Sequence, residues 1–204
     1  MSPLPPEAQA GFSAVLLAGG RSIRMGRDKA LLPHPESGLA LVLHQLATLC
    51  AAGATELFLS VRSGVDYPQV PAHIPRLTDD GGRGPMAGIA SALATTRQSR
   101  LLVLAVDLPG VTPALIRDWV SRTPSDRGFV PIGPRGTEPL CALYPRACLP
   151  FFNSALTANR LALRNVAGEL TTAGLLNPFT VNRDEYQALG NWNTPADLAG
   201  GLGH

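Results

Sequence analysis

The chain has 204 residues, of which 45% are hydrophobic and 16% are charged, and its formal net charge is +2 at pH 7. This length suits one domain and is enough to bury a substantial core. So small a net charge does not indicate a protein that coats a polyanion, so nucleic acid is not an expected partner. The sequence has no apolar run of membrane-spanning length and does not begin with a secretory signal. We therefore expect a cytoplasmic protein, with no membrane partner, in which a disordered tail at 1–10 precedes a single domain at 11–204.

The three cysteines, Cys50, Cys141 and Cys148, are odd in number and form no C-x-x-C pair. They lie among apolar residues, so we expect buried free thiols. The four histidines show no metal-ligand spacing, which argues against a zinc site.

Strand and helix patterns alternate along the chain. The predicted order is strand 13–17, helix 39–50, strands 56–61 and 74–78, a helix from Pro85, strand 101–106, helix 112–122, and strands 128–132 and 139–144. The remainder reads as mostly helical. This order predicts an α/β fold with three layers and a largely parallel, Rossmann-like central sheet.

A glycine-rich loop follows the first strand. Gly19 and Gly20 let backbone N–H groups approach an anion, and the cations that follow can neutralise it. These cations are Arg21, Arg24, Arg27 and Lys29. The alternative is an ordinary glycine turn with solvated surface cations. The spacing matches neither G-x-x-x-x-G-K-S/T nor G-x-G-x-x-G, so a P-loop is absent and a Rossmann dehydrogenase is disfavoured.

Polar residues follow three other predicted strands. Ser60, Asp79 with Asp80, and Asp107 stand at strand ends, and open α/β sheets bind ligands at that edge. A carboxylate held there by a strand can bind Mg²⁺ and leave positions for waters and a triphosphate. The alternative for Asp107 is a cap for the turn at Pro109, a role compatible with the metal.

The stretch from residue 17 to 29 resembles, almost position by position, the signature L-A-G-G-x-S-x-R-M-G-x-D-K. This signature is typical of the nucleotidyltransferases that include the molybdenum cofactor guanylyltransferases. The matching residues are Leu17, Ala18, Gly19, Gly20, Ser22, Arg24, Met25, Gly26, Asp28 and Lys29. The resemblance extends over nearly the whole chain.

Other motifs add to the resemblance. Asp107-Leu108-Pro109 is similar to the D-x-P motif that holds magnesium in the family, which implies Mg²⁺ as the cofactor with Asp107 as its ligand. The resemblance also implies that Asp79 contacts the guanine nucleotide. The segment that follows is shorter than in the family, so Asp80 is the alternative. The family usually has Asn where this chain has Ser60, which keeps an acceptor but has a shorter reach.

Three later segments resemble family motifs: 84–89 resembles G-P-L-A-G-I, 138–144 resembles Q-P-L-x-A-L-Y, and 191–195 resembles N-x-N-T-P. Arg160 and Arg164 fall in what would be the family's basic helical segment. Each motif has a structural alternative, since Gly-Pro can simply start a helix and Asn can simply cap one. The acceptor-binding residues that the resemblance implies are Gly84, Gly88, Asn191 and Asn193.

The resemblance implies transfer of GMP from GTP to molybdopterin or its molybdenum-bearing form, with release of pyrophosphate. The implied catalytic residues are Arg24, Lys29 and Asp107, because cations must offset the charge on the phosphates. The implied nucleotide-binding residues are Leu17, Ala18, Gly19, Gly20, Lys29, Ser60, Asp79 and Asp107. Proteins that insert molybdenum or mature molybdoenzymes are implied partners, and a monomer is the default expectation.

Three alternatives remain open from the sequence. The nearest is a related enzyme, such as a molybdopterin cytidylyltransferase or a sugar-1-phosphate nucleotidyltransferase. The second is a non-catalytic nucleotide-binding regulator, which would have less need of both Lys29 and Asp107. The third is a structural α/β domain, which would leave the charged residues at the strand ends unexplained.

Overall fold

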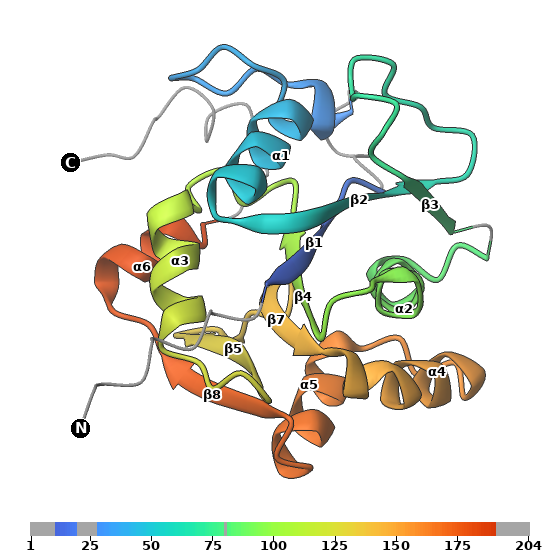
Figure 1. Ribbon diagram of the computed structural model, residues 1–204, viewed down its shortest axis with the longest axis vertical. Helices are drawn as coiled ribbons and strands as arrows, with labels where there is room; N and C mark the ends of the chain where they lie inside the picture. Colours follow the sequence, from blue (N-terminus) through green and yellow to red (C-terminus); the bar gives the residue numbers. More distant parts are fainter. Residues whose placement is uncertain (1–10, 20–27, 80, 191–204) are drawn as a thin grey trace, which may run out of the picture.

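A mixed β-sheet forms the centre of the computed structural model, which describes residues 11–19, 28–79 and 81–190 (Figure 1). In this part of the chain the strand order is β3-β2-β1-β4-β7-β5-β6, and β8 also pairs with β5. The strands are β1 Phe12–Leu17, β2 Ala54–Arg62, β3 Arg76–Asp79, β4 Arg100–Ala105, β5 Gly128–Gly133, β6 Gly136–Thr137, β7 Cys141–Pro145 and β8 Leu176–Thr180. The α-helices are α1 Leu41–Ala51, α2 Pro85–Thr95, α3 Pro113–Ser121, α4 Leu149–Thr157, α5 Leu163–Thr172 and α6 Arg183–Ala188. Two short 3-10 helices complete the described elements, η1 Lys29–Leu31 and η2 Arg146–Cys148.

The sheet has a parallel half and a mostly antiparallel half. Strands β3, β2, β1 and β4 run parallel to one another. Strand β7 runs antiparallel to both β4 and β5, β6 is antiparallel to β5, and β8 is parallel to β5. Every residue of β1 and β4 is buried, as expected for central strands covered on both faces.

Helices cover both faces of the sheet, and each face has its own hydrophobic core. Consecutive residues of β1 show the division, since Leu16 belongs to one cluster and Val15 to the other. The Leu16 cluster includes α1 and α3, and the Val15 cluster includes α2, α4 and α5 (Figure 1). The predicted three-layer α/β fold is therefore confirmed.

Some details differ from the predictions. The third strand begins at Arg76 rather than Ile74, because the chain is still in a turn there. The region after residue 145 is not all helical, because it contains β8, whose Pro178 is tolerated in a strand that pairs only with β5. Cys50 is exposed on α1, so the expectation that it is buried was wrong. Cys141 and Cys148 are buried free thiols, as predicted.

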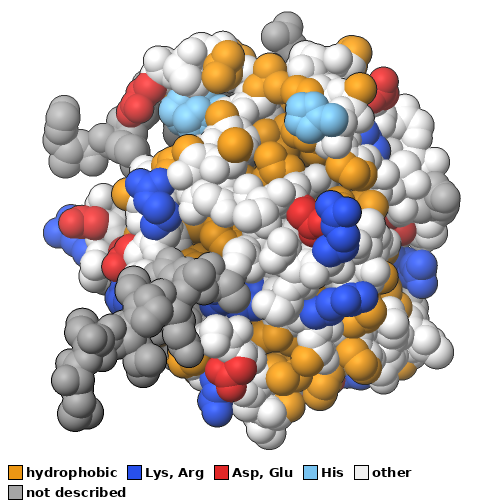
Figure 2. Space-filling view, viewed as in Figure 1, with side chains coloured by type: hydrophobic (Ala, Val, Ile, Leu, Met, Phe, Trp, Pro, Cys, Tyr) orange, Lys and Arg blue, Asp and Glu red, His pale blue; other side chains and the backbone are white. Residues whose placement is uncertain are grey.

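The described surface carries charges of both signs. On the face shown in Figure 2, basic and acidic side chains are interspersed rather than gathered into a field of one sign. In the described residues, no helix is both long and apolar enough to cross a membrane.

Candidate functional site

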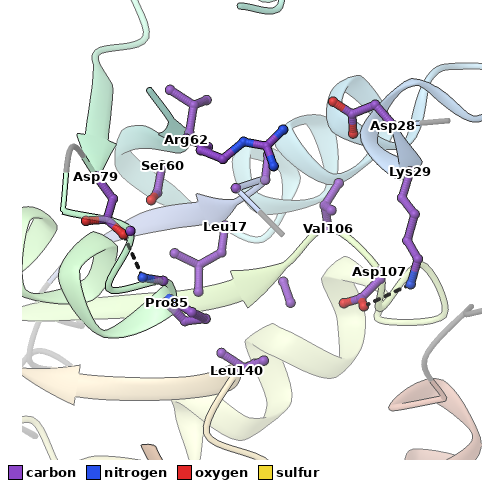
Figure 3. A pocket seen from close by; sticks show the side chains of 16 residues that line it. Leu17, Asp28, Lys29, Ser60, Arg62, Asp79, Pro85, Val106, Asp107 and Leu140 are labelled. Carbon is purple, nitrogen blue, oxygen red and sulfur yellow. Dashed lines mark hydrogen bonds and ion pairs between the residues drawn. The ribbon is translucent and has the colours of Figure 1, made fainter. Parts of the chain in front are cut away.

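A cavity of about 360 Å³ opens at the carboxyl ends of the four parallel strands (Figure 3). Parallel strands end at the same edge of a sheet, so residues far apart in the sequence meet there. Leu17 ends β1 and lies beside Ser60 of β2 on one side and Ala105 of β4 on the other. The side chains and backbone that line the cavity come from Leu17, Ala18, Gly19, Asp28, Lys29, Ser60, Val61, Arg62, Asp79, Gly82, Gly84, Pro85, Ala105, Val106, Asp107 and Leu140.

An ion pair marks one side of the cavity. The Lys29 ammonium lies 3.6 Å from Oδ2 of Asp107, and the two side chains are 16% and 28% exposed. Asp107 stands two residues beyond β4, and Lys29 is the first residue of η1. The pair places a cation and an anion together in a partly shielded cleft, where charges act more strongly than in water. Such a site can bind phosphate oxygens through the lysine and a hard cation through the carboxylate.

Asp28 determines how η1 begins. Its Oδ1 accepts a hydrogen bond from the N–H of Ala30, 3.0 Å away, and so caps the short helix. Its Oδ2 accepts a second hydrogen bond from the phenol of Tyr67, 2.8 Å away. The same phenol lies 3.1 Å from the carbonyl oxygen of Ala18. Sequence reasoning missed Tyr67, because nothing in its local pattern indicates contact with residues 39 and 49 positions away.

Asp79 and Gly84 form the opposite side of the cavity. The Asp79 carboxylate accepts a hydrogen bond of 2.6 Å from the N–H of Gly84, which fixes the start of α2 (Figure 3). Gly84 has φ of +64°, a conformation that glycine adopts without a steric penalty. The structure thus brings Asp79 and Gly84 together in the cavity wall. From the sequence, Asp79 was predicted to bind the nucleotide and Gly84 to bind the acceptor.

Gly88 lies behind the cavity wall. A Cβ at this position would collide with the Ser60 side chain, so the glycine allows α2 to pack directly on β2. Gly88 is buried and is not among the lining residues, whereas Ser60 is 6% exposed and lines the cavity. The predicted contact of Ser60 with a ligand is compatible with this geometry. Gly88 permits close packing behind the wall, and its role in acceptor binding stays a prediction.

Arg62 is a second residue that sequence reasoning missed. It ends β2 opposite Asp79, lines the cavity, and extends toward Asp28 in Figure 3. A Cβ on Gly19 would lie 3.2 Å from the Arg62 N–H nitrogen, so the glycine lets the two backbones approach closely. The position of Arg62, two residues after Ser60 and at the end of a strand that reaches the site, was the sequence signal that could have identified it.

The cavity offers few side-chain ligands for a metal ion. In the described part of the chain, His, Cys, Asp and Glu form no group of three that could hold a metal ion. Asp107 therefore provides a single carboxylate, without a protein cage. This arrangement fits Mg²⁺, which commonly binds through one or two carboxylates plus substrate phosphates and waters.

The remaining predicted residues fall into two groups. Gly20, Arg24, Asp80, Asn191 and Asn193 lie outside the described residues, so their predicted roles stay predictions. The two arginines of the predicted basic helical segment lie away from the cavity lining. Arg160 precedes α5 rather than lying in a helix and forms an ion pair with Glu169, and Arg164 lies on α5, 3.8 Å from Glu138.

Fold and site together define an α/β protein suited to binding a phosphorylated ligand, with Gly19, Lys29 and Asp107 at the carboxyl ends of parallel strands. The chain belongs to the family of the MobA-like NTP transferase domain, whose model matches residues 14–172. It is therefore a nucleotidyltransferase, and the family resemblance seen in the sequence is confirmed.

Two similar proteins have names that specify an activity. The chain is 33% identical to a probable molybdenum cofactor guanylyltransferase of Trichormus variabilis, over 92% of this chain and 89% of that protein. It is also 33% identical to the molybdenum cofactor guanylyltransferase of Pseudomonas syringae pv. syringae, over 98% and 94% of the two chains. The molybdopterin-guanine dinucleotide biosynthesis protein A of Archaeoglobus fulgidus shares the fold, with a TM-score of 0.69, 21% identity and coverage of 92% and 95%.

Proposed function

We propose that this protein transfers GMP from GTP to molybdopterin or molybdenum-bearing molybdopterin, forming the guanine dinucleotide and pyrophosphate. The observation that carries the proposal is the Lys29–Asp107 pair in the cavity, in a chain whose relatives over nearly its full length are named molybdenum cofactor guanylyltransferases. A phosphate-binding lysine beside a metal-binding carboxylate is what nucleotidyl transfer requires, because both the α-phosphate and the departing pyrophosphate carry negative charge.

The nucleotide would lie along the parallel strand ends. The backbone of residues 17–20 and the Lys29 ammonium would hold the outer phosphates. Leu17, Val106 and Leu140 give the cavity apolar walls against which a base could pack, and Ser60 and Asp79 provide polar atoms near those walls. A carboxylate at Asp79 can accept from the N1–H and N2–H of guanine, although one of its oxygens already accepts from Gly84.

Asp107 is the residue that would hold Mg²⁺. When bound, the ion would neutralise phosphate oxygens and increase the electrophilicity of the α-phosphorus. This chain's own residues position the reacting groups: Lys29 would bind the outer phosphates and offset the charge on the leaving pyrophosphate, and Asp107 would hold its carboxylate in the cavity where the metal binds. The acceptor's terminal phosphate is already ionised at neutral pH, so we assign no general base.

The acceptor would enter beside Gly84 and the turn that follows β4. Support for this comes from the end of α6, because Gly110 packs on Ala188, which precedes the predicted acceptor residues Asn191 and Asn193 by only a few positions. A Cβ on Gly110 would lie 2.9 Å from the Ala188 carbonyl oxygen. The chain therefore contacts Gly110, which follows Asp107 closely in sequence, shortly before the N-x-N-T-P motif begins.

The experiment that tests the proposal is a substrate panel. The protein is incubated with molybdopterin, Mg²⁺ and one nucleoside triphosphate at a time, and any dinucleotide formed is identified by mass spectrometry. We expect the guanine dinucleotide from GTP and little product from CTP. A preference for CTP would replace the proposal by the cytidylyltransferase alternative. Tight nucleotide binding without transfer to any acceptor would instead support the non-catalytic regulator.

A further inference from the structure

The loop between β2 and β3 is held in shape by one arginine. The guanidinium of Arg76 donates to the carbonyl oxygens of Val70 at 2.6 Å, Ile74 at 2.7 Å and Pro71 at 2.8 Å. A weaker bond of 3.4 Å goes to the carbonyl oxygen of Tyr67. These four carbonyl groups are therefore satisfied within the loop, which stabilises its conformation.

This loop places the phenol of Tyr67 next to Ala18 and Asp28, in the part of the site that would bind phosphate. The residue is only 1% exposed, and its hydroxyl faces two acceptors, the Asp28 carboxylate at 2.8 Å and the Ala18 carbonyl oxygen at 3.1 Å. Burial raises the pKa of Tyr67 above its ordinary value, and the Asp28 carboxylate raises it further, whereas Arg62 opposes the shift. The phenol therefore stays protonated and acts as a donor at every working pH.

Asp28 links Tyr67 to Lys29 through hydrogen bonds. Both of its carboxylate oxygens are engaged, one by the phenol and the other by the N–H of Ala30 in η1. Lys29 is the first residue of η1, so the direction in which its side chain leaves the backbone follows from how Asp28 is held. At the far end of that side chain, the ammonium reaches Asp107.

We propose that Tyr67 is a positioning residue for the triphosphate: through Asp28 it holds Lys29 so that the ammonium meets the outer phosphates. The inference rests on the proposed function, because it takes GTP as the ligand of Lys29. A tyrosine that only stabilised the fold would behave like Tyr144, which is also 1% exposed and donates its phenol to the Pro139 carbonyl oxygen at 2.8 Å.

The first test compares two matched substitutions, Tyr67→Phe and Tyr144→Phe. Each removes one buried hydroxyl and leaves the ring in place. Affinities for GTP and GMP are measured by calorimetry, and the thermal midpoint is recorded as a measure of stability. We expect Tyr67→Phe to weaken GTP binding about tenfold and to leave GMP binding nearly unchanged, because only the outer phosphates lose a well-placed partner. Tyr144→Phe should leave both affinities unchanged, although both variants lose some thermal stability.

A double-mutant cycle then asks whether Tyr67 acts through Lys29. In the Lys29→Ala background, Tyr67→Phe should weaken GTP binding no further, because the side chain it positions is gone. Additive losses, or equal losses for GTP and GMP, would overturn the inference. If Tyr67→Phe does not fold, Asp28→Asn takes its place in the cycle, since the amide oxygen can still cap η1 while the charged acceptor of the phenol is lost.

The same data separate this inference from the proposed function. Additive losses in a protein that binds GTP and forms the guanine dinucleotide would remove only the role of Tyr67. A wild-type protein that binds no GTP would contradict the proposed function itself, and the role of Tyr67 with it.

Discussion

The two halves of the sheet contribute unequally to the cavity. The parallel half consists of β3-β2-β1-β4 (Figure 1). Together with the loops and helix starts that follow its strands, it contributes all but one of the residues that line the cavity. The other half, β7-β5-β6 with β8, contributes only Leu140. The place of each strand in the sheet explains the difference. Strand β7 runs antiparallel to β4, so its amino end, next to Leu140, lies at the cavity edge. Strands β5 and β8 run in the same direction as β4, but β7 separates them from the four strands whose carboxyl ends form the site.

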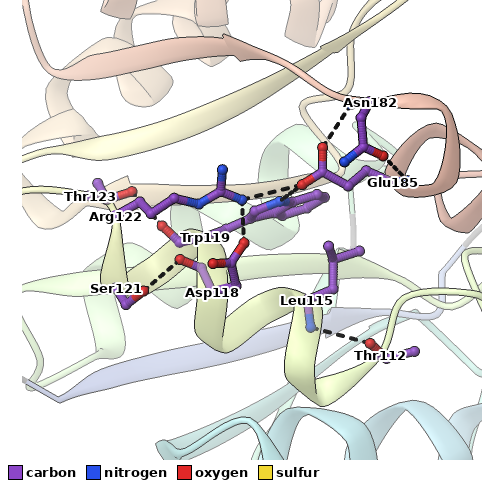
Figure 4. A network of polar contacts seen from close by, with 9 residues as sticks. All are labelled: Thr112, Leu115, Asp118, Trp119, Ser121, Arg122, Thr123, Asn182 and Glu185. Atoms are coloured by element: carbon purple, nitrogen blue, oxygen red, sulfur yellow. Dashed lines mark hydrogen bonds and ion pairs between the residues drawn. The ribbon is translucent and has the colours of Figure 1, made fainter.

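The second half is organised for packing. Trp119 of α3 makes edge-to-face contacts with Phe129 and Phe179, with ring centroids 5.8 and 5.3 Å apart. A polar network then ties α3 to α6: the Trp119 indole donates to Glu185 at 2.9 Å, and Arg122 contacts Glu185 and Asp118 (Figure 4). This half supports the turn after β4, through α3 and through the contact of Gly110 with α6.

The largest effect is expected at Asp107. Asp107→Asn keeps the shape of the side chain but removes the charge that would hold Mg²⁺, so turnover should fall by about 100-fold or more. The matched control is Asp118→Asn, on the exposed surface of α3, which should keep turnover unchanged. Both variants are measured for dinucleotide formation at saturating Mg²⁺. Normal turnover by folded Asp107→Asn would remove this carboxylate from the reaction.

Lys29 should show the next largest effect. Lys29→Ala is expected to weaken GTP binding by about 10- to 100-fold and to affect GMP binding much less, because charge-assisted bonds to the outer phosphates are lost. Calorimetric titration with each nucleotide measures the two losses separately. Equal losses for GTP and GMP would place the ammonium near the α-phosphate or elsewhere.

The contact between the two halves can be broken at Gly110. In Gly110→Ala the new Cβ would lie 2.9 Å from the Ala188 carbonyl oxygen, so α6 must shift. We expect a loss of about 1–3 kcal/mol in the free energy of unfolding, together with a several-fold loss of turnover from displacement of the Asp107 turn. Denaturant unfolding and steady-state kinetics measure these losses.

Gly168→Ala on α5 is the control for this variant. A Cβ there meets nothing within 4 Å, so the change should leave turnover intact and stabilise the helix slightly. If Gly110→Ala loses stability but keeps full turnover, α6 does not support the active-site turn.

The parallel half was also the more predictable from sequence. Continuous apolar runs identified β1 and β4, and the rule that ligands bind at strand ends brought Ser60, Asp79 and Asp107 together before the structure did. In the other half, β6 has only two residues and β8 contains a proline, so neither carries a readable alternation. Periodicity predicts which residues share a face, and this part of the fold depends on pairing between distant segments.

The wrong prediction for Cys50 and the failure to identify Tyr67 have one physical cause. Tyr67 contacts the site from a loop whose shape is fixed by Arg76, and no spacing in the sequence encodes those bonds. Cys50 shows the opposite error: it fits the apolar spacing of α1, but it lies on the solvent side of the helix. Tertiary contacts decided each case, and a single sequence does not report them.

The smallest effect on turnover is expected at Glu185 of α6, in the second half of the molecule. Burial alone would raise the pKa of Glu185, but hydrogen bonds from the Trp119 indole, the Asn182 backbone and the Arg122 guanidinium outweigh it and leave the pKa below its ordinary value of 4.5. A carboxylate with a lowered pKa stabilises the folded state above pH 4.5, and this stabilisation is lost as the pH falls through the folded value. Glu185→Gln removes the charge and keeps the size of the side chain. It should therefore cost about 1–2 kcal/mol of stability near pH 7, and the difference from wild type should shrink as the pH approaches 3.

Thermal or denaturant unfolding of both proteins between pH 7 and pH 3 measures this difference. Turnover at pH 7 should stay within about twofold of wild type, because Glu185 supports α3 and α6 and does not line the cavity. A stability difference that is constant over this pH range would mean that the charge of Glu185 contributes nothing to folding. A variant that folds normally but loses turnover would show that α3 and α6 affect the active site through contacts other than the one between Gly110 and Ala188.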